Sequence, residues 1–132
     1  MRVISLVKSA ETNKRPPPAL MEAMAVLAEE ATRTGAMIES VGLLPTSQAT
    51  RMRLSSGELI ITDGPFTEAK EMVGGYAIFE VASMEEALEW SKRFMDLHKE
   101  HWPEWEGETE IRPMFAPQDP AAPCRVEIPE TK

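Results

Sequence analysis

The residues best suited to chemistry crowd into one stretch of the chain, residues 60–76, which reads IITDGPFTEAKEMVGGY. Within it, Asp63 and Glu71 supply carboxylates and Lys70 supplies an ammonium group. A carboxylate accepts a proton, and a partly desolvated lysine binds an anion or donates a proton once its pKa falls. Asp63 and Lys70 are therefore the candidates for a catalytic base and acid.

Two aromatic residues, Phe66 and Tyr76, lie on either side of this lysine in the sequence. Together with Glu71 they form the candidate ligand-binding set, because aromatic walls with a few polar groups are typical of small-molecule pockets. The structural alternative is that Phe66 and Tyr76 belong to the core and that Lys70 and Glu71 belong to a solvated turn. Both interpretations remain open at the level of the sequence.

A tight turn accounts for the centre of this stretch without any function. Asp63 is suited to hydrogen-bond its own backbone, Pro65 fixes the next backbone position, and Gly64 tolerates unusual dihedral angles. Gly74 and Gly75 permit a β-bulge at the start of the following strand. Their spacing is not that of a phosphate-binding loop, so no nucleotide site is predicted.

The histidines and the cysteine do not assemble into a second catalytic centre. His98 and His101 lie one helical turn apart beside glutamates, a spacing that would suit a divalent metal. The end of a helix favours such side chains without any metal, so we predict no metal site and no cofactor. Cys124 has no partner for a disulfide or a zinc cluster. We expect Trp102 and Trp105 to cover the end of a barrel or a seam between subunits.

Length and charge limit the classes of function. A chain of 132 residues fits one domain. The net charge of −8 argues against nucleic acid as a partner, because that binding depends on neutralising phosphates with lysine and arginine. The apolar stretches are much shorter than the roughly 20 residues that span a bilayer, and the chain opens on a strand-like pattern. We therefore expect a cytoplasmic protein without a membrane partner.

Hydrophobic periodicity predicts the order strand, helix, strand, hairpin, strand, helix, strand. The expected helices span residues 17–34 and 83–98, and the expected strands span residues 2–8, 36–44, 49–54, 58–62, 76–81 and 108–115. Gly35 suits the end of the first helix, and Ser83 with Glu86 forms a capping box at the start of the second. Pro113 limits the last strand to an edge of the sheet or a bulge.

The hairpin is expected to have one wet face and one covered face. In residues 49–54, Met52 and Leu54 alternate with Arg51 and Arg53, so the first pair is predicted to point inward and the second outward.

The whole pattern predicts an α+β fold, a ferredoxin-like split β-α-β sheet with an extra β-hairpin and two helices on one face. The strands at 2–8, 58–62 and 76–81 carry apolar side chains on both faces. Because two helices cover only one face, the other would leave several hundred Å² of apolar surface in water. We therefore predict a homodimer. We assign residues 1–115 to this domain and residues 116–132 to a Pro-rich C-terminal arm or a disordered tail.

The central motif is similar to a known family signature. The string TDGPFTEAKE at 62–71, followed by GGY at 74–76, resembles the signature of the DGPF group of YCII-related proteins. The similarity runs from Arg2 to about Phe115 and includes EEALEW at 85–90 and EIRP at 110–113. It implies a dimeric α/β barrel of ferredoxin-like subunits. Most members of this family are uncharacterised.

The resemblance also carries expectations about partners and chemistry. Some members are encoded beside sigma factors, and some relatives in the wider superfamily act on small aromatic compounds. Members that resemble enzymes are proposed to pair a histidine on the first helix with an aspartate. Residues 17–34 contain no histidine, so that dyad does not carry over.

Two classes of function follow. The first is a small non-enzymatic dimer that binds a small molecule or a protein partner in a cleft near the DGPF turn. The second is a cofactor-independent lyase or isomerase that acts on a small metabolite, aromatic compounds included, with Asp63 and Lys70 as acid and base.

Overall fold

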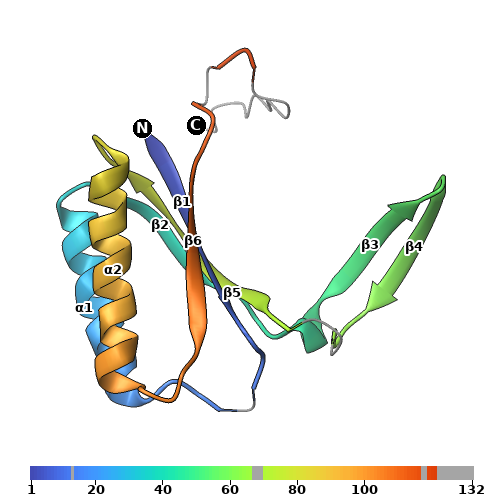
Figure 1. The fold of residues 1–132 in the computed structure, drawn as a ribbon, viewed down its shortest axis with the longest axis horizontal. Helices are drawn as coiled ribbons and strands as arrows, with labels where there is room; N and C mark the ends of the chain where they lie inside the picture. The colour runs from blue at the N-terminus through green and yellow to red at the C-terminus, as the bar shows by residue number, and fades with distance from the viewer. Residues whose placement is uncertain (13, 67–69, 117–118, 122–132) are drawn as a thin grey trace, which may run out of the picture.

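The computed structural model describes residues 1–12, 14–66, 70–116 and 119–121 (Figure 1). The predicted order of helices and strands is confirmed, with a short 3-10 turn added before the hairpin. The elements are β1 (Arg2–Ser9), α1 (Pro18–Arg33), β2 (Met37–Gly42), η1 (Thr46–Gln48), β3 (Thr50–Ser55), β4 (Glu58–Asp63), β5 (Met72–Glu80), α2 (Met84–His101) and β6 (Gly107–Pro113).

Four strands form one antiparallel sheet in the order β2-β5-β1-β6, and both helices lie on the same face of it (Figure 1). The first and third of these strands along the chain are central, which is consistent with a ferredoxin-like arrangement. β6 is an edge strand with Pro113 at its end, as predicted. The fold is therefore α+β.

The core lies between one end of the sheet and the helices. Val3 on β1 pairs with Phe79 on β5, and both pack with Ala36, Val81 and Ala87 in one buried cluster. Leu20, Leu27 and Ala31 are the buried residues of α1, which agrees with the predicted apolar stripe. Gly35 follows that helix with φ +83°, a backbone conformation that glycine adopts without strain.

The start of α2 follows the predicted capping box with one change. The Ser83 hydroxyl accepts a hydrogen bond from the backbone N–H of Glu86 at 3.3 Å. The Glu86 carboxylate in turn accepts from the N–H of Ala82 at 2.9 Å, not from that of Ser83. The helix also continues to His101, beyond the predicted end at His98, so the connection to β6 is shorter than expected.

β5 begins at Met72, earlier than the predicted start at residue 76. Val7 pairs with Gly75 and Lys8 pairs with Val73, so Gly74 has no partner on β1. The expected glycine bulge is therefore present at Gly74.

The hairpin β3–β4 forms a separate two-stranded sheet that projects from the body (Figure 1). The prediction that Met52 and Leu54 point into a covered interior is wrong for the single chain, because they are 68% and 73% exposed. They pair with Ile61 and Leu59 respectively, so one face of the hairpin carries four apolar side chains. The hairpin projects away from the sheet, and no helix or strand within the described residues covers that face.

The outer face of the four-stranded sheet is also apolar. Ile4 pairs with Ile78 and Leu6 pairs with Tyr76, on the side opposite the buried Val3. Both helices lie on the other side, and these four side chains remain only partly buried. Apolar residues on both faces of the sheet are therefore confirmed.

Most of the proposed C-terminal arm, residues 116–132, lies outside the described residues. Within the described part of the chain, neither helix combines the length and apolar character needed to cross a membrane.

Candidate functional site

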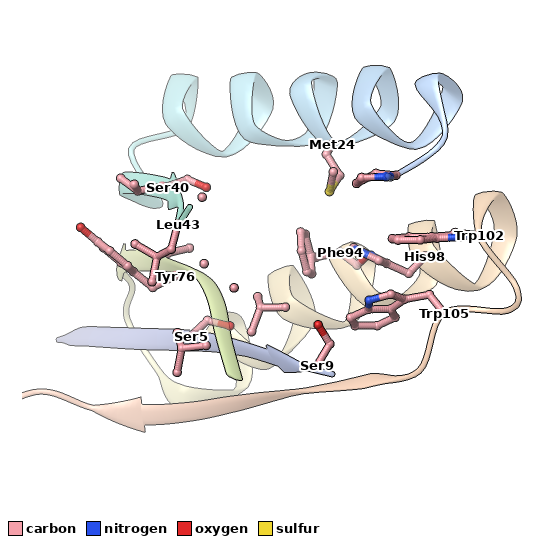
Figure 2. Close-up of a pocket in the computed structure, with 18 of the residues that line it drawn as sticks. Ser5, Ser9, Met24, Ser40, Leu43, Tyr76, Phe94, His98, Trp102 and Trp105 are labelled. Carbon is pink, nitrogen blue, oxygen red and sulfur yellow. The ribbon is translucent and has the colours of Figure 1, made fainter. Parts of the chain in front are cut away.

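A cavity of about 890 Å³ lies between α1, the sheet and the C-terminal end of α2 (Figure 2). One wall is formed by α1 with residues that include Met21, Met24 and Ala28. The floor is formed by β1, β5 and β2, and the far end is closed by the aromatic residues near the end of α2.

Small residues on the sheet explain why this part of the helix–sheet interface is hollow. The floor contains Ser5 and Ser9 of β1, and Gly75 and Ala77 of β5. At the core end, the same face carries larger side chains such as Phe79. Two packed layers with small residues on the sheet side leave space that the helix side chains do not fill.

The cavity is not enclosed but opens to the outside of the protein, so its volume of about 890 Å³ is accessible to water and to a small molecule.

Four side chains close one end of the cavity: Phe94, His98, Trp102 and Trp105. We call this cluster the aromatic end of the cavity, and its rings are tightly packed. The His98 ring lies 4.6 Å from the Phe94 ring and 4.4 Å from the Trp105 ring, between centroids, at interplanar angles of 55° and 42°. Trp102 stacks on Trp105 with centroids 6.5 Å apart. Successive four-residue steps along α2 bring Phe94, His98 and Trp102 to one helix face.

His98 is the buried titratable group of this cluster, with 7% of its surface exposed. Its Nδ1 lies 3.0 Å from the carbonyl oxygen of Phe94. A carbonyl only accepts, so Nδ1–H is the donor and Nε2 of the neutral ring carries a lone pair. Burial lowers the pKa of His98 below its ordinary value of 6.5, and the backbone hydrogen bond opposes that shift only in part. The ring is therefore neutral at pH 7.

Other polar groups line the cavity away from its aromatic end. The Ser91 and Ser5 hydroxyls are 3.5 Å apart, and both residues are buried. Tyr76 and Ser40 lie toward the opposite end (Figure 2). The pKa of Tyr76 is raised by burial and then by the negative charge and hydrogen bond of Glu39. Tyr76 therefore remains a neutral phenol under physiological conditions.

The charged residues that line the cavity are mostly acidic. Glu11, Glu104 and Glu106 are carboxylates, and Lys14 is the cation among the described lining residues. Lys14 is exposed. The arrangement does not favour an anionic ligand.

Four of the five site residues predicted from the sequence do not line this cavity. Asp63, Lys70 and Glu71 are exposed, and Phe66 is buried elsewhere. Asp63 accepts a hydrogen bond from the Thr50 hydroxyl at 3.1 Å across the base of the hairpin. Only Tyr76 of the predicted set borders the cavity. Its pairing with Leu6 places its side chain on the outer face of the sheet, so it lies at the edge of the cavity and not in its floor. The structure thus separates the residues that the sequence groups together.

The DGPF turn is bound instead to the segment that follows β2. The backbone N–H of Phe66 donates to the Thr46 hydroxyl at 3.2 Å. The Thr46 hydroxyl and backbone N–H each donate to the Glu11 carboxylate at 2.7 Å. The Arg51 guanidinium lies 3.9 Å above the Phe66 ring. Hydrogen bonds and a cation–π contact thus fix the base of the hairpin.

Gly64 is required at this turn because of a close backbone approach. A Cβ atom on Gly64 would overlap the carbonyl oxygen of Thr46 and lie 3.3 Å from that of Ala49. The Gly64 N–H donates to the same Ala49 oxygen at 2.9 Å. Its backbone is not left-handed, so the close contact, and not the freedom of its dihedral angles, explains the glycine.

Sequence reasoning missed the aromatic end of the cavity as a site. It weighed His98 only as a metal ligand and Trp102 and Trp105 as cover for a barrel end or a subunit seam. Among the described residues, no group of three or more His, Cys, Asp or Glu side chains is arranged to hold a metal ion. The four-residue spacing of Phe94, His98 and Trp102 was the signal available in the sequence.

Comparison with known proteins identifies relatives of the chain. The model of the YCII-related domain matches residues 1–99. An uncharacterized protein from Rhizobium meliloti (strain 1021) is 36% identical over 72 residues, which are 54% of each protein. The chain thus spans about half the length of this curated relative. The relative's description carries no activity.

Proposed function

The chain belongs to the YCII-related family, and on that premise we propose that it is a cytoplasmic, homodimeric, small-molecule-binding protein of the DGPF group of that family. The single observation that supports this function is the cavity between α1 and the sheet. Its volume is within the ~300–1,000 Å³ of small-molecule sites, and its walls are apolar with a few polar groups. We therefore propose that the ligand binds in this cavity and not in a cleft near the DGPF turn.

Filling the cavity tests the binding function. Ala28 faces the cavity from α1, whereas Ala19 on the same helix is exposed and lies outside it. We expect 2-methoxynaphthalene to bind the wild-type protein in isothermal titration calorimetry. Ala28→Phe should weaken that binding at least tenfold, and the matched control Ala19→Phe should leave it unchanged. Equal affinity of the two variants, or no binding to the folded wild-type protein, would reject the cavity as a ligand site.

Two apolar surfaces support the homodimer. The first is the outer sheet face with Ile4, Leu6 and Ile78, and the second is the hairpin face that carries Met52, Leu54, Leu59 and Ile61. An isolated two-stranded hairpin is marginally stable in water, so its fold needs a partner that is always present. A second copy of the chain meets that need at matching concentration. In a symmetric dimer both subunits bury the same surface, so one apolar face of the chain covers two copies.

One pair of substitutions tests this dimer. Ile61 lies on the apolar hairpin face, and its neighbour Ile60 lies on the opposite face with the arginines. We expect Ile61→Lys to raise the dimer dissociation constant at least a hundredfold, because the charge is buried at two symmetric positions. Ile60→Lys should change it by less than a factor of five. Sedimentation of the wild-type protein as a single chain at micromolar concentration would refute the dimer.

The alternative function is a cofactor-independent lyase or isomerase on a small metabolite, aromatic compounds included, with Asp63 and Lys70 as acid and base. Its support is the closeness of these residues in the sequence, since both side chains are exposed outside the cavity. Phe66 and Glu71, predicted as ligand contacts, also lie outside the cavity, whereas Tyr76 borders it. A protein partner such as a sigma factor rests on family analogy alone.

A further inference from the structure

We propose that the aromatic end of the cavity recognises neutral, flat molecules that carry a hydroxyl or N–H donor, with Nε2 of His98 as the acceptor. This proposal rests on the small-molecule function proposed above. It specifies which end of the cavity orients the ligand and which chemical feature the site selects.

The hydrogen bonding of His98 provides the acceptor. Nδ1 is committed to the carbonyl oxygen of Phe94, so Nε2 has no proton of its own in the neutral ring. Among the described residues, every buried side-chain nitrogen or oxygen has a partner. Nε2 of His98 has no hydrogen-bond partner among these residues, so part of its surface must be accessible to solvent. His98 lines both the main cavity and a smaller recess beside it.

The walls around this acceptor favour a flat ligand. Phe94 and Trp105 lie against the His98 ring, and Met24 faces them from α1 (Figure 2). Aromatic faces and a polarizable thioether contact planar rings well. A ligand ring in this space gains apolar contact on several sides while its donor reaches Nε2.

The charges nearby oppose an anionic ligand. The charged groups that line the cavity or the recess with His98 are Glu104 and Glu106 of the connection to β6, Lys99 of α2, and Lys14 and Glu11 before α1. Carboxylates outnumber cations there, and Lys14 is exposed. A deprotonated ligand would also bring a second acceptor against Nε2, and that contact is repulsive.

Three naphthalene derivatives of similar shape test the selectivity. We expect 2-naphthol, which has a donor, to bind the wild-type protein about tenfold more tightly than 2-methoxynaphthalene, a factor that corresponds to one hydrogen bond. The anion 2-naphthoate should bind most weakly. Calorimetric titrations at pH 7 give all three affinities.

Substitution of His98 assigns the preference to its ring. His98→Phe keeps an aromatic ring and removes the acceptor, so the two neutral ligands should bind with equal affinity. His101→Phe is the matched control, because His101 lies on the next helical turn, near Glu100, outside both cavities. This control should retain the tenfold preference.

The wild-type protein alone gives a further test that does not depend on a variant that folds. Protonation of His98 turns Nε2 into a donor, so the affinity for 2-naphthol should fall as the pH is lowered through the pKa of His98. The affinity for 2-methoxynaphthalene should stay constant. Equal binding of the two neutral ligands at pH 7, or tighter binding of the anion, would overturn this inference while leaving small-molecule binding intact. Failure of all three to bind would instead remove the proposed function.

Discussion

The DGPF turn and the aromatic end of the cavity both place polar groups beside aromatic rings. The two regions differ in how many of these polar groups form hydrogen bonds within the protein. At the turn, Thr46 bonds to both Glu11 and Phe66, and Asp63 accepts from Thr50. At the aromatic end, Nδ1 of His98 has a partner in the carbonyl oxygen of Phe94, whereas Nε2 has none among the residues that the structure describes. A polar group that forms its hydrogen bonds within the protein stabilises the fold. A polar group that lines a cavity without a protein partner is available to a ligand.

This difference assigns separate roles to the two regions. The turn joins the hairpin to the body and determines where its apolar face lies. The aromatic end closes a cavity that small sheet residues leave open. The cluster of charged residues in the sequence therefore belongs to the anchor of the hairpin, and the isolated polar ring of His98 among aromatic residues belongs to the proposed binding site.

Substitution of Gly64 should break the turn most severely. In Gly64→Ala the new Cβ would overlap the backbone of Thr46, which a side-chain rotation cannot relieve. We expect the free energy of unfolding to fall by about 3 kcal/mol or more, measured by urea denaturation. The proposed dimer should form more weakly as well, because the base of the hairpin must shift.

Gly74→Ala is the matched control for that prediction. A Cβ atom at Gly74 would meet no atom within 4 Å, and its φ is not left-handed. This variant should change stability by less than about 1 kcal/mol. Equal stability of the Gly64→Ala variant and the wild-type protein would mean that the turn does not constrain the hairpin.

Much of the fold follows from periodicity and capping signals in the sequence. The stripe of α1, Gly35 after it, the glycine bulge at Gly74 and the edge position of Pro113 are local features, and all of them are present. The orientation of the hairpin is not local. Alternation in residues 49–54 indicates an apolar face but cannot specify what covers it.

The candidate site depends on distant contacts and was harder to predict. Sequence proximity grouped Asp63 and Lys70 with Tyr76, yet the bulged start of β5 leads from an exposed turn into the cavity wall. The cavity results from small residues on β1 and β5 that face the two helices. Small residues that lie far apart in the sequence do not form a recognisable motif, so the sequence alone does not indicate the cavity.

His98 gives the aromatic end a pH-dependent contribution to stability. The fold holds the pKa of His98 below 6.5, so the unfolded chain takes up a proton first as the pH falls. The contribution is complete above about pH 6.5 and is lost between that value and the lower pKa of the folded state. Across that window the free energy of unfolding should decline by up to about 1.4 kcal/mol per pH unit on account of this residue.

Urea denaturation of His98→Gln across this pH range provides the measurement. The variant should lose this part of the pH dependence, whereas His101→Gln should retain it. The nearby Lys99, Glu104 and Glu106 are present in both variants, so their titration cancels in the comparison. Parallel pH profiles for the two variants would mean that the ring of His98 is not protected from protonation by its packing.

Asp63→Asn should have the smallest effect, and its outcome separates the two proposed functions. An asparagine amide oxygen still accepts the hydrogen bond from Thr50, so the hairpin base should remain intact and stability should change by less than about 0.5 kcal/mol. Affinity for 2-naphthol should also be unchanged, because Asp63 lies outside the cavity. If a substrate were found whose turnover this variant abolished while the protein stayed folded, Asp63 would be a catalytic base. The turn would then be a reaction site as well as the anchor of the hairpin.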